Sequence, residues 1–77
     1  MVREGWIREV NGLWILRFSY DWQSWDKNPM VWIEKGKLQP NEIPLLKKRK
    51  RVRRHFAIKL WRDLLATGWR RTDPQWD

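Results

Sequence analysis

Apolar and polar residues alternate along residues 5–20, which is the pattern of half-buried β-strands. Residues 5–10 and 13–20 predict two strands, because the Asn11-Gly12 pair between them is a strong signal for a tight hairpin turn. A two-residue loop fixes the register and places Ile7 opposite Leu16 and Trp6 opposite Arg17. This pairing gathers the core candidates on one face: Ile7, Trp14, Leu16, Phe18 and Tyr20. The other face is mixed and carries Trp6, Arg8, Val10, Leu13, Ile15 and Arg17.

A third strand is predicted at residues 30–34, after a connection in which Trp22 and Trp25 are expected to plug the edge of the core. Residues 38–46 predict a linker, because Pro40 and Pro44 lack the backbone N–H that regular strand pairing requires. The chain before residue 38 is therefore expected to form a three-stranded antiparallel sheet, about the smallest sheet that is stable with little help.

From Val52 onwards the apolar residues recur with the 3.6-residue period of an amphipathic helix. The helix is predicted at residues 52–67, and Gly68 suits the left-handed position after its last turn. Residues 45–54 are expected either to extend this helix, because Lys and Arg are good helix formers, or to form a mobile arm. The tail, residues 68–77, carries Trp69 and Trp76, which are expected to fold back onto the domain. We predict a single α+β domain in which one C-terminal α-helix packs on a three-stranded antiparallel sheet made of residues 5–34.

The composition limits both the core and the chemistry. A chain of 77 residues forms one domain with a marginal core, and its eight tryptophans supply the large apolar groups that such a core requires. There is no cysteine and a single histidine, His55, so disulfides and zinc sites are excluded and no cofactor is expected. The chain shows no nucleophile grouping and no glycine-rich phosphate loop, so neither an enzyme nor a small-molecule substrate is expected. The N-terminus lacks the apolar stretch of a signal peptide, which predicts a cytoplasmic location.

Positive charge is concentrated in the basic tract, residues 47–54, where seven of eight residues are Lys or Arg. Residues 1–46 hold six basic and six acidic residues, so the whole net charge of +8 lies after Leu46. The tract runs into the predicted helix, whose N-terminal end carries partial positive charge, and each cation there costs about 0.3–1 kcal/mol. Folding alone does not favour this arrangement, so we expect an external polyanion to supply the compensating charge.

Nucleic acid, either DNA or RNA, is the polyanion that these features favour. Clustered cations neutralise phosphates and release counterions, which gives an affinity that falls steeply with salt. The predicted helix offers no Asn or Gln for reading base edges, so binding of weak sequence specificity is expected. The predicted phosphate contacts are Lys47, Lys48, Arg49, Lys50, Arg51, Arg53 and Arg54, extended by Arg62, Arg70 and Arg71.

The mixed face of the sheet offers a second mode of binding. Trp6 and Arg17 are expected to lie opposite each other there, and bases of a single strand could stack on them for about 1–3 kcal/mol each. The alternative is structural: the two residues form a cross-strand cation–π pair, or Trp76 covers this face.

An acidic protein surface would attract the same basic tract. The alternative function is therefore a regulator that docks on a large host complex such as RNA polymerase or the ribosome. A peripheral role at a membrane surface comes third, because the apolar side of the helix is better used to cover the sheet. Exposed tryptophan in a self-complementary patch could also pair two copies as a homodimer.

Several motifs together resemble a known family. They are Gly5-Trp6-Ile7, the aromatic hairpin, the basic tract, the run Leu60-Trp61-Arg62-x-Leu64-Leu65-x-x-Gly68-Trp69-Arg70 and the ending Pro74-Gln75-Trp76. The pattern is similar to that of a family of short, Trp-rich cyanobacterial and cyanophage proteins that share a domain of unknown function. The chain departs from that family where acidic residues are common ahead of Ala57, since Arg54 and His55 stand there. The resemblance implies a cyanobacterial or cyanophage cytoplasm and no particular mechanism.

Overall fold

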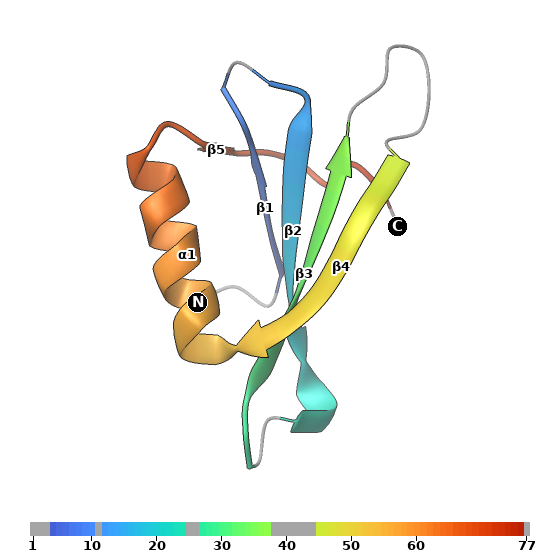
Figure 1. The fold of residues 1–77 in the computed structure, drawn as a ribbon, viewed down its shortest axis with the longest axis vertical. Helices are drawn as coiled ribbons and strands as arrows, with labels where there is room; N and C mark the ends of the chain where they lie inside the picture. The colour runs from blue at the N-terminus through green and yellow to red at the C-terminus, as the bar shows by residue number, and fades with distance from the viewer. Residues whose placement is uncertain (1–3, 11, 25–26, 38–44, 77) are drawn as a thin grey trace.

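The structure, a computed structural model, describes residues 4–10, 12–24, 27–37 and 45–76, with the side chains of residues 45–47 left out. Its elements are strands β1 (Glu4–Arg8) and β2 (Trp14–Asp21), the 3-10 turn η1 (Trp22–Ser24), strands β3 (Met30–Lys37) and β4 (Leu45–Arg53), helix α1 (Arg54–Ala66) and strand β5 (Arg70–Arg71). All pairings are antiparallel, and the strands form one sheet in the order β4-β3-β2-β1-β5 (Figure 1).

The prediction of a three-stranded sheet was wrong, because the sheet has five strands. Two strands were missed, β4 and β5. The basic tract lies mostly in β4. This strand pairs along the length of β3, from Met30 opposite Arg53 to Lys37 opposite Leu45. Lys and Arg are good helix formers, so the local sequence gave no sign of a strand. The gain from pairing with a long neighbouring strand overrides that weak preference.

The bounds of several elements differ from the prediction. The first two strands are residues 4–8 and 14–21, and the third strand continues to Lys37 instead of ending at residue 34. Leu45 and Leu46 belong to β4 and not to the predicted linker, while residues 38–44 of that linker lie outside the described part of the chain. The helix begins at Arg54 instead of Val52. The predicted tail contains β5, which pairs Arg71 with Ile7 and Arg70 with Arg8.

The predicted hairpin register is confirmed. Trp6 lies opposite Arg17 and Ile7 opposite Leu16, and the Glu9 N–H donates to the Trp14 carbonyl oxygen at 3.0 Å. Asn11 of the predicted turn lies outside the described residues. The register matters for function, because it fixes which side chains of β2 and β3 share a face.

The hydrophobic core lies between the sheet and α1. Ile7, Leu16, Phe18, Val31, Ile33 and Ala57 form its buried cluster. The helix adds partly buried side chains such as Leu60 and Trp61, and the Trp61 ring meets Phe18 edge to face at a centroid distance of 5.1 Å. We refer to this side of the sheet as the helix-side face and to the opposite side as the reverse face.

The end of α1 follows the predicted pattern. Gly68 has a φ of 109°, which is the left-handed conformation expected after the last turn. The Trp69 N–H donates to the Leu64 oxygen at 3.1 Å and the Gly68 N–H to the Leu65 oxygen at 3.3 Å, which is the bond pair of a Schellman motif. Trp69 then packs against the core cluster, as predicted.

The reverse face is partly covered by the C-terminal segment. After β5, the Thr72 N–H donates to the Trp6 oxygen, and the Trp76 ring meets the Trp6 ring edge to face at 4.5 Å. The predicted return of Trp76 onto the domain is therefore confirmed. The loop tryptophans are different: Trp22 packs against Tyr20 but remains 54% exposed, so it does not plug the core edge, and Trp25 lies outside the described residues.

Candidate nucleic-acid interface

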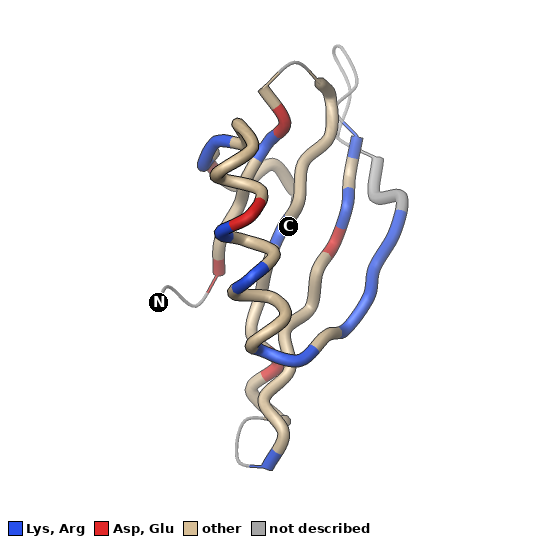
Figure 2. The backbone as a smooth tube through the Cα atoms, turned by 60° about the vertical axis from the view of Figure 1, so that its left-hand side comes forward, with Lys and Arg blue, Asp and Glu red and all other residues tan. Residues whose placement is uncertain are grey.

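The basic tract occupies an edge strand, so its side chains divide between the two faces of the sheet. Figure 2 shows β4 as an almost continuous line of cationic residues at one border of the sheet. Lys48 and Lys50 share the helix-side face with Val52, since Val52 lies opposite the core residue Val31. Arg49, Arg51 and Arg53 therefore belong to the reverse face. The register between β3 and β4 shifts at Lys47, and the side chain of Lys47 lies outside the described part of the chain.

On the reverse face, two of the three arginines of β4 have carboxylate partners within the described part of the chain. Arg49 Nε lies 3.7 Å from Glu34 Oε2, and Arg51 Nε lies 3.0 Å from Asp21 Oδ2. The Arg49 guanidinium also lies 3.9 Å from the centroid of the Trp32 ring. This local compensation explains the position of two cations of the tract without any external ligand.

The same compensation extends across the sheet as an alternating charge ladder. Arg17 bridges Glu4 on β1, at 3.0 Å, and Glu34 on β3, at 3.3 Å, and Glu34 in turn meets Arg49 on β4. A single ion pair near the surface contributes only about 0–1 kcal/mol, but the series leaves little uncompensated charge on this part of the reverse face.

The helix-side face of the same two strands lacks such compensation. Lys35 lies directly opposite Lys48, and Lys50 and Lys37 lie next to them on the same face. Among the residues that the structure describes, no carboxylate pairs with Lys48 or Lys50. Like charges directly opposite each other destabilise a sheet, so this arrangement is unfavourable for folding in the absence of an anion.

An aromatic side chain borders these lysines. The half-buried Trp14 lies opposite Lys37 on the neighbouring strand, and the Nζ atoms of Lys35 and Lys37 are 4.3 and 5.9 Å from the centroid of its ring. The Glu9 side chain contacts Gly12 and makes no ion pair with these lysines among the described contacts. We call Lys35, Lys37, Lys48, Lys50 and Trp14 the lysine face.

Helix α1 does not cover the lysine face. The helix follows β4 directly and turns away from the N-terminal half of that strand. This half of β4 lies apart from the helix in both views (Figures 1 and 2). Lys48 and Lys50 are exposed, in agreement with this arrangement. The side chains are therefore accessible to a large ligand.

The remaining predicted phosphate contacts are dispersed. Arg53 precedes the first residue of α1 and Arg54 begins it, close to the C-terminal end of β4, whereas Arg62 is exposed further along the helix. Arg70 and Arg71 lie on β5, at the opposite edge of the sheet from β4. The ten predicted residues therefore do not form one surface.

The argument from the helix dipole applies to fewer cations than predicted. Only Arg53, at the N-cap, and Arg54 lie at the start of α1, which has no side-chain cap and no acidic residue in its first turn. The other cations of the tract belong to a strand. Further along, Asp63 accepts a hydrogen bond from Lys59 Nζ at 2.8 Å and raises the pKa of Lys59 above its ordinary value. Lys59 is thus compensated locally.

The predicted stacking site at Trp6 and Arg17 is not accessible. Trp6 is 5% exposed, packs against Trp76 and donates from Nε1 to Glu4 at 2.8 Å. The Arg17 guanidinium lies 5.3 Å from the Trp6 ring and pairs with carboxylates on both sides. The structural alternative, a cross-strand cation–π pair covered by Trp76, describes these residues.

Lys35, Lys37 and Trp14 were not among the predicted contacts. The sequence contains a signal for them, because Lys35-Gly36-Lys37 continues the two-residue alternation of the third strand and places both lysines with Trp14 once the register is known. The described residues contain no group of three or more His, Cys, Asp or Glu side chains that could hold a metal ion. None of the helices among them is long and apolar enough to cross a membrane.

Comparison with known proteins identifies a family but no function. The sequence model of a family described as "Protein of unknown function (DUF1651)" matches residues 4–76. No curated protein and no solved structure matches the chain.

Proposed function

This chain belongs to the DUF1651 family of proteins of unknown function, and on that premise we propose that it is a small non-enzymatic protein that binds nucleic-acid phosphates with weak sequence specificity. The observation that supports this proposal most is the contrast between the two faces of β3 and β4. The reverse face pairs Arg49 and Arg51 with carboxylates, whereas the lysine face places Lys35 opposite Lys48 without one. A phosphate backbone would supply the missing negative charge.

The chemistry of the lysine face suits a polyanion better than a single small anion. An ammonium group binds phosphate as a compact point charge, and four of them spread over two strands can contact several phosphates at once. The face offers no Asn, Gln or Arg fork for recognising a base edge, which is the basis for expecting weak specificity. Trp14 adds a ring on which an unpaired base could stack once Lys35 moves onto a phosphate.

A titration at several salt concentrations tests the proposal. Fluorescently labelled random-sequence single-stranded DNA, single-stranded RNA and duplex DNA are titrated with the protein, and anisotropy gives the affinity. If about four phosphates are contacted, the slope of log K against log salt is about −3 for a single strand and about −4 for a duplex. Absence of binding at low salt, or an affinity independent of salt, would reject the proposal.

A second candidate is a regulator that binds an acidic surface of a large host complex such as RNA polymerase or the ribosome. It is favoured by the position of β4 at the sheet edge. The Arg54 N–H donates to the Pro29 oxygen, so by the alternation of antiparallel ladders the backbone groups of Arg49, Arg51 and Arg53 point outwards. An extended acidic segment could add there as another strand. Retention of one protein from nuclease-treated lysate, without affinity for nucleic acid, would favour this candidate.

Other aspects of the function remain predictions. A cytoplasmic setting in a cyanobacterium or its phage is proposed on the resemblance given above. A homodimer also stays a prediction. Binding at a membrane surface has less support, because the apolar residues of α1, such as Leu60 and Leu64, pack on the sheet.

A further inference from the structure

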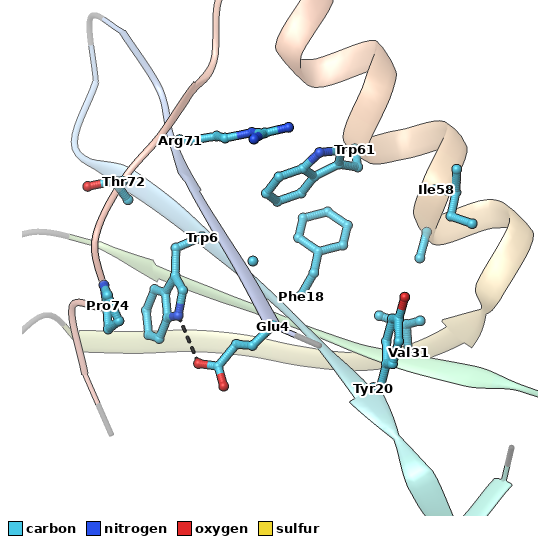
Figure 3. A pocket seen from close by; sticks show the side chains of 12 residues that line it. Glu4, Trp6, Phe18, Tyr20, Val31, Ile58, Trp61, Arg71, Thr72 and Pro74 are labelled. Carbon is cyan, nitrogen blue, oxygen red and sulfur yellow. Dashed lines mark hydrogen bonds between the residues drawn. The ribbon is translucent and has the colours of Figure 1, made fainter. Parts of the chain in front are cut away.

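A cavity of about 590 Å³ lies between the sheet, helix α1 and the C-terminal segment. Its wall on the sheet is formed by Gly5 and Phe18, its wall on α1 by Trp61 and Ile58, and Arg71 and Pro74 lie on the side of the C-terminal segment (Figure 3). A volume of 590 Å³ is within the range of about 300–1,000 Å³ typical of small-molecule sites.

The cavity exists because β5 is short. β5 pairs with β1 only at Ile7 and Arg8, and after the bond from Thr72 to Trp6 the chain reaches Pro74, which has no N–H to continue the ladder. Gly5 pairs with Phe18 of β2, but on its other side β1 has no partner strand at Gly5 among the described residues. This missing section of strand leaves room between the sheet edge, the helix and the tail.

Glycine at position 5 also shapes this space. A Cβ atom at Gly5 would lie 2.7 Å from Cη2 of Trp61, so the indole can reach the strand only because no side chain is present. Trp61 then closes one side of the cavity and meets Phe18 edge to face. The walls are mostly aromatic and apolar, and aromatic walls favour stacking with another ring.

Two charged residues line the cavity, and they are not equivalent. The Glu4 carboxylate already accepts a hydrogen bond from Trp6 Nε1 at 2.8 Å and pairs with Arg17 at 3.0 Å (Figure 3). Arg71 is exposed, and within the described part of the chain it has no carboxylate partner; its guanidinium lies 6.0 Å from the Trp61 ring centroid. The uncompensated charge of the cavity is therefore positive.

We infer that this cavity binds a small planar aromatic molecule that carries one anionic group. The ring lies against the wall that Gly5, Phe18 and Trp61 form together, and the anionic group pairs with the Arg71 guanidinium. Arginine suits this role, because its planar fork binds a carboxylate through two hydrogen bonds. The site is independent of the proposed nucleic-acid interface, since it shares no residue with the lysine face and uses a different cation.

A nuclear magnetic resonance titration with a carboxylate probe and its uncharged isostere tests the inference. The ¹⁵N-labelled full chain is titrated with 2-naphthoate and with 2-naphthamide. Amide and indole resonances of Gly5 and Trp61 are followed, because these residues line the cavity. We expect saturable shifts there with both ligands and tighter binding of naphthoate.

Two adjacent arginines provide a matched pair of variants. Arg71 lies opposite Ile7 and so shares the helix-side face, whereas Arg70 lies opposite Arg8 on the reverse face and does not line the cavity. Arg71→Gln should weaken naphthoate binding about tenfold and leave naphthamide binding unchanged, and Arg70→Gln should change neither. Both side chains are exposed, so both variants should fold.

Two results would overturn the inference. One is the absence of saturable shifts at Gly5 and Trp61 at millimolar naphthoate. The other is an equal loss of naphthoate affinity in Arg70→Gln and Arg71→Gln, which would mean that net charge alone attracts the ligand. Neither result bears on phosphate binding by Lys48 and Lys50.

Discussion

Lys35 and Lys48 lie directly opposite each other on β3 and β4, while one residue along the same two strands Glu34 lies opposite Arg49. Adjacent positions of one ladder thus carry a repulsive pair on the helix-side face and an attractive pair on the reverse face. The difference indicates that the reverse face between β3 and β4 is arranged for stability. On the lysine face the repulsion between Lys35 and Lys48 remains, and we infer that an external anion relieves it.

Reversing the charge of Lys48 should separate stability from binding. In Lys48→Glu, the new carboxylate faces Lys35, so the free energy of unfolding should rise by about 0.2–1 kcal/mol, measured by urea denaturation. Affinity for a labelled single strand should fall about tenfold. Lys27→Glu, the same charge change at an exposed turn, should alter both quantities less. Loss of stability in Lys48→Glu would contradict the interpretation of the lysine face.

The charge ladder of the reverse face should depend on Glu34. Its side chain is 13% exposed and pairs with both Arg17 and Arg49, so Glu34→Gln leaves two guanidinium groups without this carboxylate. We expect a loss of about 1–2 kcal/mol in the free energy of unfolding. Asp63→Asn, which breaks the exposed pair with Lys59, should cause no measurable loss. Equal effects of the two substitutions would show that the ladder has no special role.

The contact between Gly5 and Trp61 should be visible as a coupling between two substitutions. Gly5→Ala places a methyl group 2.7 Å from the indole and should cost about 1–3 kcal/mol. Trp61→Ala should cost about 3 kcal/mol, because the ring is only partly buried. In the double variant the clash is absent, so the combined loss should be smaller than the sum of the two. Strict additivity in thermal or urea unfolding would argue against the close approach.

The cations of β4 should also keep two copies of the chain apart. An edge strand exposes backbone groups that can pair with another strand, and Lys and Arg side chains oppose such pairing. Replacing Lys48, Lys50 and Arg53 with Thr should increase self-association with concentration, measured by sedimentation velocity. Replacing Lys27, Lys59 and Arg62 with Thr removes the same charge away from both edges of the sheet. If both triple variants associate equally, net charge and not the edge controls association.

The parts of the fold predicted correctly depend on local signals. The register between Ile7 and Leu16 was predicted from the Asn11-Gly12 turn signal, and the helix end from Gly68, which adopts the left-handed conformation. Both are properties of a few consecutive residues. The missed strands depend on distant partners: β4 requires the full length of β3, and β5 consists of two arginines with no strand signal of their own.

The candidate site was only partly predictable for the same reason. The sequence identifies the basic tract as the unusual segment, but which cations are compensated depends on pairings across the sheet. Arg49 and Arg51 meet Glu34 and Asp21, residues that precede them by more than ten positions. Trp6 became buried because Trp76 returns to it from the end of the chain. Periodicity alone does not contain these contacts.

The most direct measurement compares two double variants of the same strand in binding one single-stranded oligonucleotide. Lys48→Gln with Lys50→Gln and Arg49→Gln with Arg51→Gln each remove two charges from β4, but from opposite faces. If the lysine face binds phosphates, the lysine variant should lose about tenfold more affinity than the arginine variant. Its slope of log K against log salt should also become about 1.4 less negative. Equal losses in the two variants, or a larger loss in the arginine variant, would contradict phosphate binding by the lysine face.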